Sequence, residues 1–313
     1  MRFLLIYFKG MLIGMADLVP GISGGTVALI TDIYKELIWS IDHIKLSAIL
    51  TLFNEGFKAF WKKINGPFLT ALFGGIITSV LLFSRLIEYF IENESLRLWA
   101  LFFGLLVASI FYLIRKNKIY TTSSFGLVLL GVVISVSISF FTPKTIELNY
   151  PYLFFCGLIA ISAMILPGLS GAYILMILGA YKLILSTVRK VQDLIFAFDS
   201  ELFYEVFSIL GVFMFGLVVG IKLFSKVLHW LFKKYPNNTI AVLVGLMAGA
   251  LHKIWPWQNE VSSFETISKS IQTTAVLPQN FDGDPQLLSV LFLMVLGFFI
   301  LFVLERLKPN ANV

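Results

Sequence analysis

Two short stretches of this chain combine proline, glycine and serine in a pattern that can form an anion-binding site from backbone N–H groups. The pattern Pro-Gly-x-Ser-Gly occupies residues 20–24 and recurs at residues 167–171, each time inside an apolar stretch. Proline and glycine break a helix, and serine accepts a hydrogen bond from the first N–H groups of the next helix. That helix then presents free N–H groups and a partial positive charge. The pattern predicts a phosphate site made by Gly21, Ser23, Gly24, Gly25 and Thr26 in the first copy and by Gly168, Ser170 and Gly171 in the second.

The two copies belong to a longer repeat. Six residues recur 147 positions later, where Pro20, Gly21, Ser23, Gly24, Tyr34 and Lys35 are matched by Pro167, Gly168, Ser170, Gly171, Tyr181 and Lys182. A second block repeats at a spacing of 141, with Phe83-Ser84-Arg85 matched by Phe224-Ser225-Lys226. One motif alone would be explained by close packing of small residues between helices. Two copies in one register favour a chain built from two equivalent halves.

Four cations are related by this repeat and are candidate phosphate ligands. Lys35 corresponds to Lys182, and Arg85 corresponds to Lys226. If the halves are inverted, Arg85 and Lys182 lie toward one membrane face and Lys35 and Lys226 toward the other. Snorkelling of long basic side chains to the lipid headgroups is the alternative for any one of them.

Two carboxyl groups are candidates for proton coupling. Asp17 precedes the first motif by three residues and has no acidic counterpart, since its match is Met164. Glu88 aligns with His229. An ionisable group within a membrane segment is expensive and is usually functional. The histidines, His43, His229 and His252, are scattered, and we expect no metal ion, no cofactor and no ATP-binding loop.

The composition is that of a membrane protein. Hydrophobic residues make up 58% of the 313-residue chain and charged residues 13%, and the mean hydropathy is +0.89. These values exclude an ordinary soluble domain, and no feature suggests a nucleic-acid partner. The single cysteine, Cys156, lies in an apolar stretch, where a small core residue is the expected role.

The apolar pattern predicts an all-α polytopic membrane protein with two repeats, residues 1–149 and 150–313. Each repeat begins with a re-entrant broken hairpin, residues 3–39 and 151–187, with 3–17 and 26–39 as the arms of the first. Arms of about 14 residues extend about 21 Å, less than the roughly 30 Å of a bilayer core. Three spans follow in each repeat, at about 67–91, 97–114 and 124–142 and at about 205–232, 239–254 and 287–304.

Three spans in each half require the second half to enter from the opposite face, so the repeats are predicted to be inverted. This assignment places twelve lysine and arginine residues on one side of the membrane and six on the other. Positive residues accumulate on the cytoplasmic side of a membrane. We therefore expect both termini in the cytoplasm, and we expect the amphipathic segment 40–66 to lie along the lipid headgroups.

The stretches GMADLVPGISGGTVALITDIY and MILPGLSGAYILMILGAY resemble the PopT family of polyprenyl-phosphate translocases over essentially the whole length of the chain. The resemblance implies a transporter of the bacterial plasma membrane, not an enzyme. Its substrate would be undecaprenyl phosphate, a lipid carrier returned from the outer to the inner leaflet for reuse in cell-wall synthesis. The residues alone indicate only an anion carrier with inverted repeats and possible proton coupling. An isoprenoid phosphate, as the resemblance implies, would also require a route open to membrane lipids.

Two other classes compete with this interpretation. An ion-coupled small-anion transporter or channel would also place half-helix N-termini around a central site, with a sealed aqueous vestibule in place of an opening toward lipid. A membrane phosphatase would need a nucleophile beside a clustered basic motif, and the scattered histidines argue against one.

Overall fold

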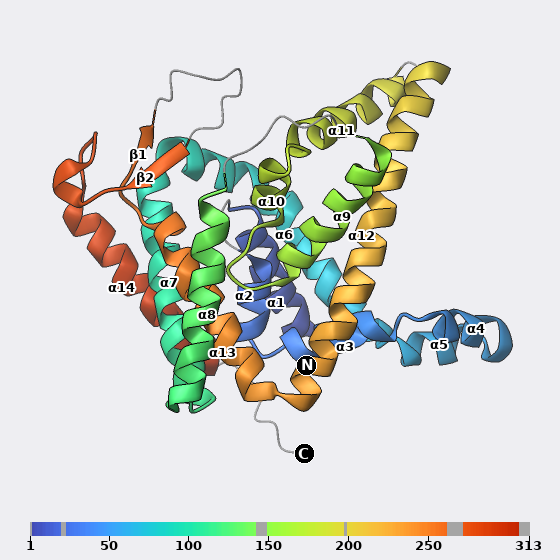
Figure 1. The fold of residues 1–313 in the computed structure, drawn as a ribbon, viewed down its shortest axis with the longest axis horizontal. Coiled ribbons are helices and arrows are strands. Elements are labelled where there is room, and N and C mark those ends of the chain that lie inside the picture. The colour runs from blue at the N-terminus through green and yellow to red at the C-terminus, as the bar shows by residue number, and fades with distance from the viewer. Residues whose placement is uncertain (1, 20–22, 142–148, 197–198, 262–271, 307–313) are drawn as a thin grey trace.

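The computed structural model describes residues 2–19, 23–141, 149–196, 199–261 and 272–306, which are almost entirely helical (Figure 1). Among them, four helices are long and apolar enough to cross a membrane. These are α6 (Gly66–Asn93), α7 (Ser95–Lys116), α8 (Thr122–Ser139) and α12 (Ser200–Lys234). A fifth candidate is the bent pair formed by α10 (Gly171–Ile177) and α11 (Tyr181–Phe196). The protein is thus an all-helical, multi-pass membrane protein.

The first hairpin contains three helices, not the two expected from the sequence. Helix α1 (Arg2–Asp17) is followed by α2 (Gly24–Ile30) and α3 (Tyr34–His43). Asp32, between α2 and α3, has a φ of 62°, and the N–H of Ile33 donates to the carbonyl of Ala28 at 3.1 Å. A left-handed residue with a bond of this kind terminates a helix. The prediction of one continuous arm over 26–39 is therefore wrong.

The second hairpin has the same turn at the matching position. After α9 (Tyr150–Ile165), helices α10 and α11 are separated by Gly179, which has a φ of 73°. The N–H of Ala180 donates to the carbonyl of Leu175 at 3.0 Å. The two helices are bent by 115° relative to each other. Gly179 stands 147 positions after Asp32, so the repeat preserves a backbone turn as well as the motif.

In each half, the first hairpin helix packs along the first long span through close glycine contacts. A Cβ atom on Gly75 of α6 would lie 2.0 Å from the carbonyl oxygen of Tyr7 in α1. A Cβ atom on Gly216 of α12 would lie 2.1 Å from the carbonyl oxygen of Phe154 in α9. Gly216 and Phe154 follow Gly75 and Tyr7 by 141 and 147 positions. The pairs α1–α6 and α9–α12 therefore use equivalent backbone contacts.

The remaining spans connect the two halves. Helix α8 packs on α13 (Pro236–Ala250), and α14 (Leu287–Arg306) packs on α7. A Cβ atom on Gly245 of α13 would lie 2.1 Å from the carbonyl oxygen of Val128, and one on Gly104 of α7 would lie 1.9 Å from that of Met294. Each half thus contributes its third span to the second span of the other half.

The span expected at 239–254 differs in form. Helix α13 ends at Ala250, and the chain continues as a 3₁₀ turn, η1 (Leu251–Ile254). Fifteen helical residues extend about 22 Å, less than a bilayer core. The segment then leads to the antiparallel pair β1 (Gln258–Val261) and β2 (Gln272–Ala275), followed by η2 (Pro278–Asn280). The helical end of α13 thus lies beside the hairpins instead of at a far surface.

The first hairpin forms the centre of the molecule, and two short helices lie outside it. In α2, Gly24 and all residues from Thr26 to Ile30 are buried, and Tyr34 at the start of α3 is 1% exposed. Helices α4 (Leu46–Glu55) and α5 (Phe57–Lys63) project from the body (Figure 1). Their exposed side chains include Leu50, Phe53 and Phe57 as well as Lys58, Lys62 and Lys63. This mixture matches the amphipathic surface segment expected from the sequence.

Candidate functional site

The N-terminus of α2 is in contact with a carboxyl side chain of the protein. Asp17, the last residue of α1, accepts a hydrogen bond from the N–H of Gly24 through Oδ1 at 2.6 Å. A Cβ atom on Gly24 would lie 2.5 Å from the other carboxylate oxygen, so only glycine allows this approach. Carboxylates are stabilised at helix N-termini, as phosphates are. Asp17 thus occupies the position predicted for an anion.

Ser23 caps α2, as predicted, and also contacts the second hairpin. Its Oγ accepts from the N–H of Gly25 at 3.2 Å. The same hydroxyl group, which carries one proton to donate, lies 3.2 Å from the carbonyl oxygens of both Met164 and Leu166. The residue is 4% exposed, so the cap of the first half is buried against the second.

Two further hydrogen bonds join the hairpins. The N–H of Gly168, in the second motif, donates to Thr26 Oγ1 at 3.2 Å. The hydroxyl of Tyr34 donates to the carbonyl of Ile165 at 3.2 Å. Backbone that lacks helical bonds needs such partners when it is away from water. The two broken hairpins therefore meet through hydrogen bonds near their motifs.

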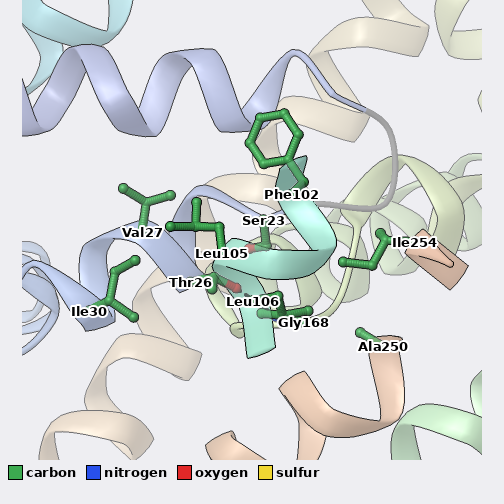
Figure 2. A pocket seen from close by; sticks show the side chains of 10 residues that line it. All are labelled: Ser23, Thr26, Val27, Ile30, Phe102, Leu105, Leu106, Gly168, Ala250 and Ile254. Carbon is green, nitrogen blue, oxygen red and sulfur yellow. Dashed lines mark hydrogen bonds between the residues drawn. The ribbon is translucent and has the colours of Figure 1, made fainter. Parts of the chain in front are cut away.

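A pocket lies directly beside this junction (Figure 2). Ser23 and Thr26 line it with their hydroxyl groups, and Thr26 accepts from the N–H of Gly168, which also lines the pocket. The other walls are mainly apolar and come from α2, α7 and the end of α13 with η1: Val27, Ile30, Phe102, Leu105, Leu106, Ala250 and Ile254. The pocket thus combines two hydroxyl groups with a mainly apolar lining.

The second tip adds a cation that the sequence analysis did not select. Ser170 caps α10 by accepting from the N–H of Tyr173 at 3.4 Å. The ring of Tyr173 lies 3.2 Å from the ammonium group of Lys253, measured to the ring centre. Lys253 belongs to η1, next to the pocket residue Ile254. A cation–π contact of this kind holds a positive charge beside the tips.

The cations proposed from the repeat lie elsewhere. Arg85 of α6, Lys182 of α11 and Lys226 of α12 are exposed, as is the carboxyl candidate Glu88. Lys35 is also exposed, and its ammonium group lies 5.5 Å from the ring centre of Phe232. Gly21 falls outside the described residues. The phosphate-binding roles of these residues stay predictions. Among the site residues predicted from the sequence, the ones that the structure brings to the junction of the two hairpins are Asp17, Ser23, Gly24, Gly25, Thr26 and Gly168.

Lys253 could have been found only in part from the sequence. It ends an apolar segment in which charge is costly, and this is a recognisable signal. Its partner Tyr173 stands 80 positions earlier, in α10. The pairing therefore depends on how η1, at the end of α13, packs on the hairpin of the same half. Spacing along the chain does not reveal that contact.

The fold and the junction define a helical membrane protein with a buried site between two broken hairpins. The chain belongs to the VCA0040-like family, described as undecaprenyl phosphate translocase-like, whose family model matches residues 13–273. This result agrees with the resemblance seen in the two motif stretches.

Two relatives have names that agree with this family. The chain is 37% identical to the polyprenyl-phosphate transporter of Vibrio cholerae over 262 residues, which is 84% of this chain and 80% of the relative. It is 28% identical to the polyprenyl-phosphate transporter of Staphylococcus aureus over 260 residues, 79% of this chain and 84% of the relative. Both are named as transporters and not as enzymes. No solved structure matches the chain significantly.

Proposed function

We propose that the protein carries undecaprenyl phosphate, or a closely related polyprenyl phosphate, from the outer to the inner leaflet of the plasma membrane for reuse in cell-wall synthesis. Membership of the translocase-like family and the names of both relatives support this substrate class. The observation that carries the proposal is the hydrogen-bonded meeting of the two hairpin tips beside a largely apolar pocket. An isoprenoid phosphate needs both an anion site and apolar surroundings.

The phosphate binds at the N-terminus of α2, where it replaces the carboxylate of Asp17. The bond from Gly24 N–H to Asp17 supports this exchange, because a carboxyl oxygen already accepts from the N–H group that the phosphate would use. Two anions cannot share one N–H group without strong repulsion, so protonation of Asp17 favours the exchange. This links substrate binding to a proton. Lys253 provides a positive charge for the bound phosphate, supported by its contact with Tyr173 near the second tip.

Transport proceeds by alternating access in two inverted repeats. The equivalent glycine contacts of α1–α6 and α9–α12, and the matching turns at Asp32 and Gly179, support this relation between the halves. Inverted repeats allow one half to adopt the conformation of the other, which opens the site to the opposite face. Both termini are cytoplasmic, supported by the excess of basic residues on that side of the span assignment.

The test is leaflet-resolved transport in proteoliposomes. Labelled undecaprenyl phosphate is placed in the outer leaflet, and its arrival in the inner leaflet is followed with and without a pH gradient. We expect transport by the protein and its loss by about tenfold or more in Lys253→Met, since removal of a charge partner costs about 1.5–3 kcal/mol. Lys233→Met, an exposed residue at the end of α12, is the matched control.

The same assay separates the competing class. A small-anion transporter would move inorganic phosphate or chloride across the membrane. With such a protein, an excess of either ion would abolish any movement of the labelled lipid between leaflets. If the vesicles transport these ions and leave the polyprenyl phosphate in its original leaflet, the proposed function is wrong.

A further inference from the structure

We propose that Asp42, His43 and His229 form a binding site for a divalent transition-metal ion, which joins α3 of the first half to α12 of the second. Asp42 and His43 end α3, and His229 lies on the part of α12 against which α3 packs. One ligand atom of each residue lies within 4.8 Å of the ligand atoms of the other two. Asp42 and His229 are 187 positions apart in sequence, so only the fold brings them together.

The present distances are close to those of a coordination sphere. Nδ1 of His229 lies 2.7 Å from Oδ2 of Asp42. Donor atoms around one ion, each about 2.0–2.2 Å from it, lie roughly 3–3.5 Å apart. Small side-chain rotations therefore suffice to place an ion between the three groups. The proton now on Nδ1 of His229 then moves to Nε2 of the same ring, and Nδ1 becomes the ligand.

The imidazole of His43 is held in place by two contacts on its own helix. Nδ1 of His43 lies 2.7 Å from the carbonyl oxygen of Trp39. A carbonyl only accepts, so the proton is on Nδ1 and the lone pair is on Nε2. Metal-binding histidines are commonly held by such a bond from the other ring nitrogen. The indole ring of Trp39 also stacks on His43, with ring centres 3.9 Å apart, which fixes the plane of the imidazole.

The carboxylate faces the other groups of the cluster. The Asp42 side chain is 7% exposed, and its Oδ2 lies 2.7 Å from Nδ1 of His229 and 3.4 Å from Nζ of Lys45. The oxygen that a metal ion would bind is therefore already directed at the imidazole of the other half.

Two lysines near the cluster oppose a cation and must be accounted for. Lys45 Nζ lies 3.4 Å from Oδ2 of Asp42, but its side chain is 51% exposed and can turn into solvent when an ion replaces it. Lys222 Nζ donates to the carbonyl of Ile41 at 2.6 Å, so its charge is held on the backbone and not on the carboxylate. Their repulsion lowers the affinity without occupying the ligand positions.

The donor set selects the kind of ion. Two imidazole nitrogens and one carboxylate suit Zn²⁺, Co²⁺, Ni²⁺ or Cu²⁺, whereas Mg²⁺ and Ca²⁺ prefer oxygen donors alone. His229 has 31% of its side chain exposed, which leaves room for water to complete the coordination. The alternative is that no ion binds, and that Asp42 and His229 form only a hydrogen-bonded carboxylate–imidazole pair that fastens α3 to α12.

The experiment uses the full-length protein in detergent, purified without a polyhistidine tag. Co²⁺ is added stepwise, its visible absorption is recorded, and Zn²⁺ is then added as a competitor. We expect one Co²⁺ per chain, displaced by Zn²⁺, and an affinity lower by at least about tenfold in His43→Gln, His229→Gln and Asp42→Asn. His252→Gln, which changes a histidine bonded to Gly249 in another part of the molecule, should titrate like the unmodified protein.

Thermal unfolding provides the second measurement and monitors folding of the variants. An ion that binds only the folded state raises the melting temperature by mass action. Zn²⁺ should raise it in the unmodified protein and in His252→Gln but not in Asp42→Asn, which retains a group able to accept from His229. Absence of saturable Co²⁺ binding, or equal binding by His229→Gln and His252→Gln, overturns the proposal and leaves the hydrogen-bonded pair.

Discussion

Thr26 connects the two hairpins through a single hydroxyl group, and this contact can be tested directly. Thr26→Val keeps the shape of the side chain and removes the acceptor for Gly168 N–H. An unpaired buried donor costs about 1–3 kcal/mol, so the variant should unfold at a lower temperature in detergent and transport more slowly. Thr26→Ser should behave like the unmodified protein.

The control for this substitution is Thr70→Val. Thr70 is exposed on α6, and its hydroxyl donates to the carbonyl of Gly66 within the same helix. The Thr70→Val variant should unfold at nearly the same temperature as the unmodified protein. Equal changes in Thr26→Val and Thr70→Val would show that the bond between the hairpins has no special importance.

Asp17 is the second residue whose role follows from its contact. Asp17→Asn keeps an oxygen for Gly24 N–H but cannot take up a proton. Since an ionised Asp17 competes with the substrate phosphate, uptake by the unmodified protein should rise as the pH falls. The variant should lose this dependence, apart from the titration of the lipid phosphate itself, and should still exchange bound substrate.

Three comparisons make the Asp17 measurement decisive. Asp17→Ala should also lower the unfolding temperature, because it removes the acceptor as well as the charge. Glu88→Gln examines the other candidate for proton coupling. Glu92→Gln changes another exposed glutamate of α6 and is the control, which should leave the pH dependence of uptake unchanged. A parallel loss of exchange and uptake in Asp17→Asn, with an unchanged pH profile, would assign Asp17 a structural role.

At the level of helices, the repeat predicts equal sensitivity at matching glycines. A Cβ atom on Gly75 or Gly216 would lie 2.0 or 2.1 Å from a carbonyl oxygen of the neighbouring helix. Because backbone cannot yield as a side chain can, Gly75→Ala and Gly216→Ala should each destabilise the protein by at least about 1–3 kcal/mol. Unfolding in detergent, followed by circular dichroism, measures the effect.

Two other helical glycines serve as controls for these substitutions. Gly126 of α8 and Gly211 of α12 have no neighbouring atom within 4 Å of an added Cβ. Alanine at either position should preserve or raise stability, by up to about 1 kcal/mol, because it favours the helix. If Gly75→Ala proves harmful and Gly216→Ala harmless, the two helix pairs are not equivalent.

The positions of the helices were largely predictable, and their interruptions were not. Apolar stretches and the two Pro-Gly-x-Ser-Gly motifs are sufficient to place α1, α6, α7, α8 and α12 within a few residues. The turn at Asp32 is different, since aspartate seldom adopts a positive φ without support. Here an ion pair between Asp32 and Lys116 of α7 accompanies the turn. In the sequence, only the glycine at the matching position 179 indicates this turn.

At the level of the whole molecule, the packing of helices that are distant in sequence determines which contacts the sequence could not predict. The hairpin tips were predictable as a pair because both carry the same motif. Lys253 with Tyr173, and Asp42 with His229, have no repeated pattern, and each pairing depends on how distant helices pack. The repeat aligns His229 with Glu88, whereas its contact in the fold is with Asp42.

Sidedness is a property of the whole molecule, and it tests the two-repeat transport model. Arg85 and Lys182 should receive the lipid phosphate at the outer face, and Lys35 and Lys226 should release it at the inner face. All four are exposed on helix surfaces, where a lipid headgroup can reach them. Arg85→Lys should impair transport even though the charge is kept, because a planar guanidinium group binds two phosphate oxygens at once. Lys226→Arg should be milder.

The measurement offers labelled polyprenyl phosphate to one leaflet of proteoliposomes that contain uniformly oriented protein. Arg85→Gln should reduce uptake from the outer leaflet far more than from the inner leaflet, and Lys226→Gln should show the opposite bias. An inverted repeat places equivalent residues at opposite depths, so one substitution should affect one direction of access. Equal losses from both leaflets would reject separate receiving and releasing sites, and unchanged uptake from both would mean that these side chains only anchor the helices at the headgroups.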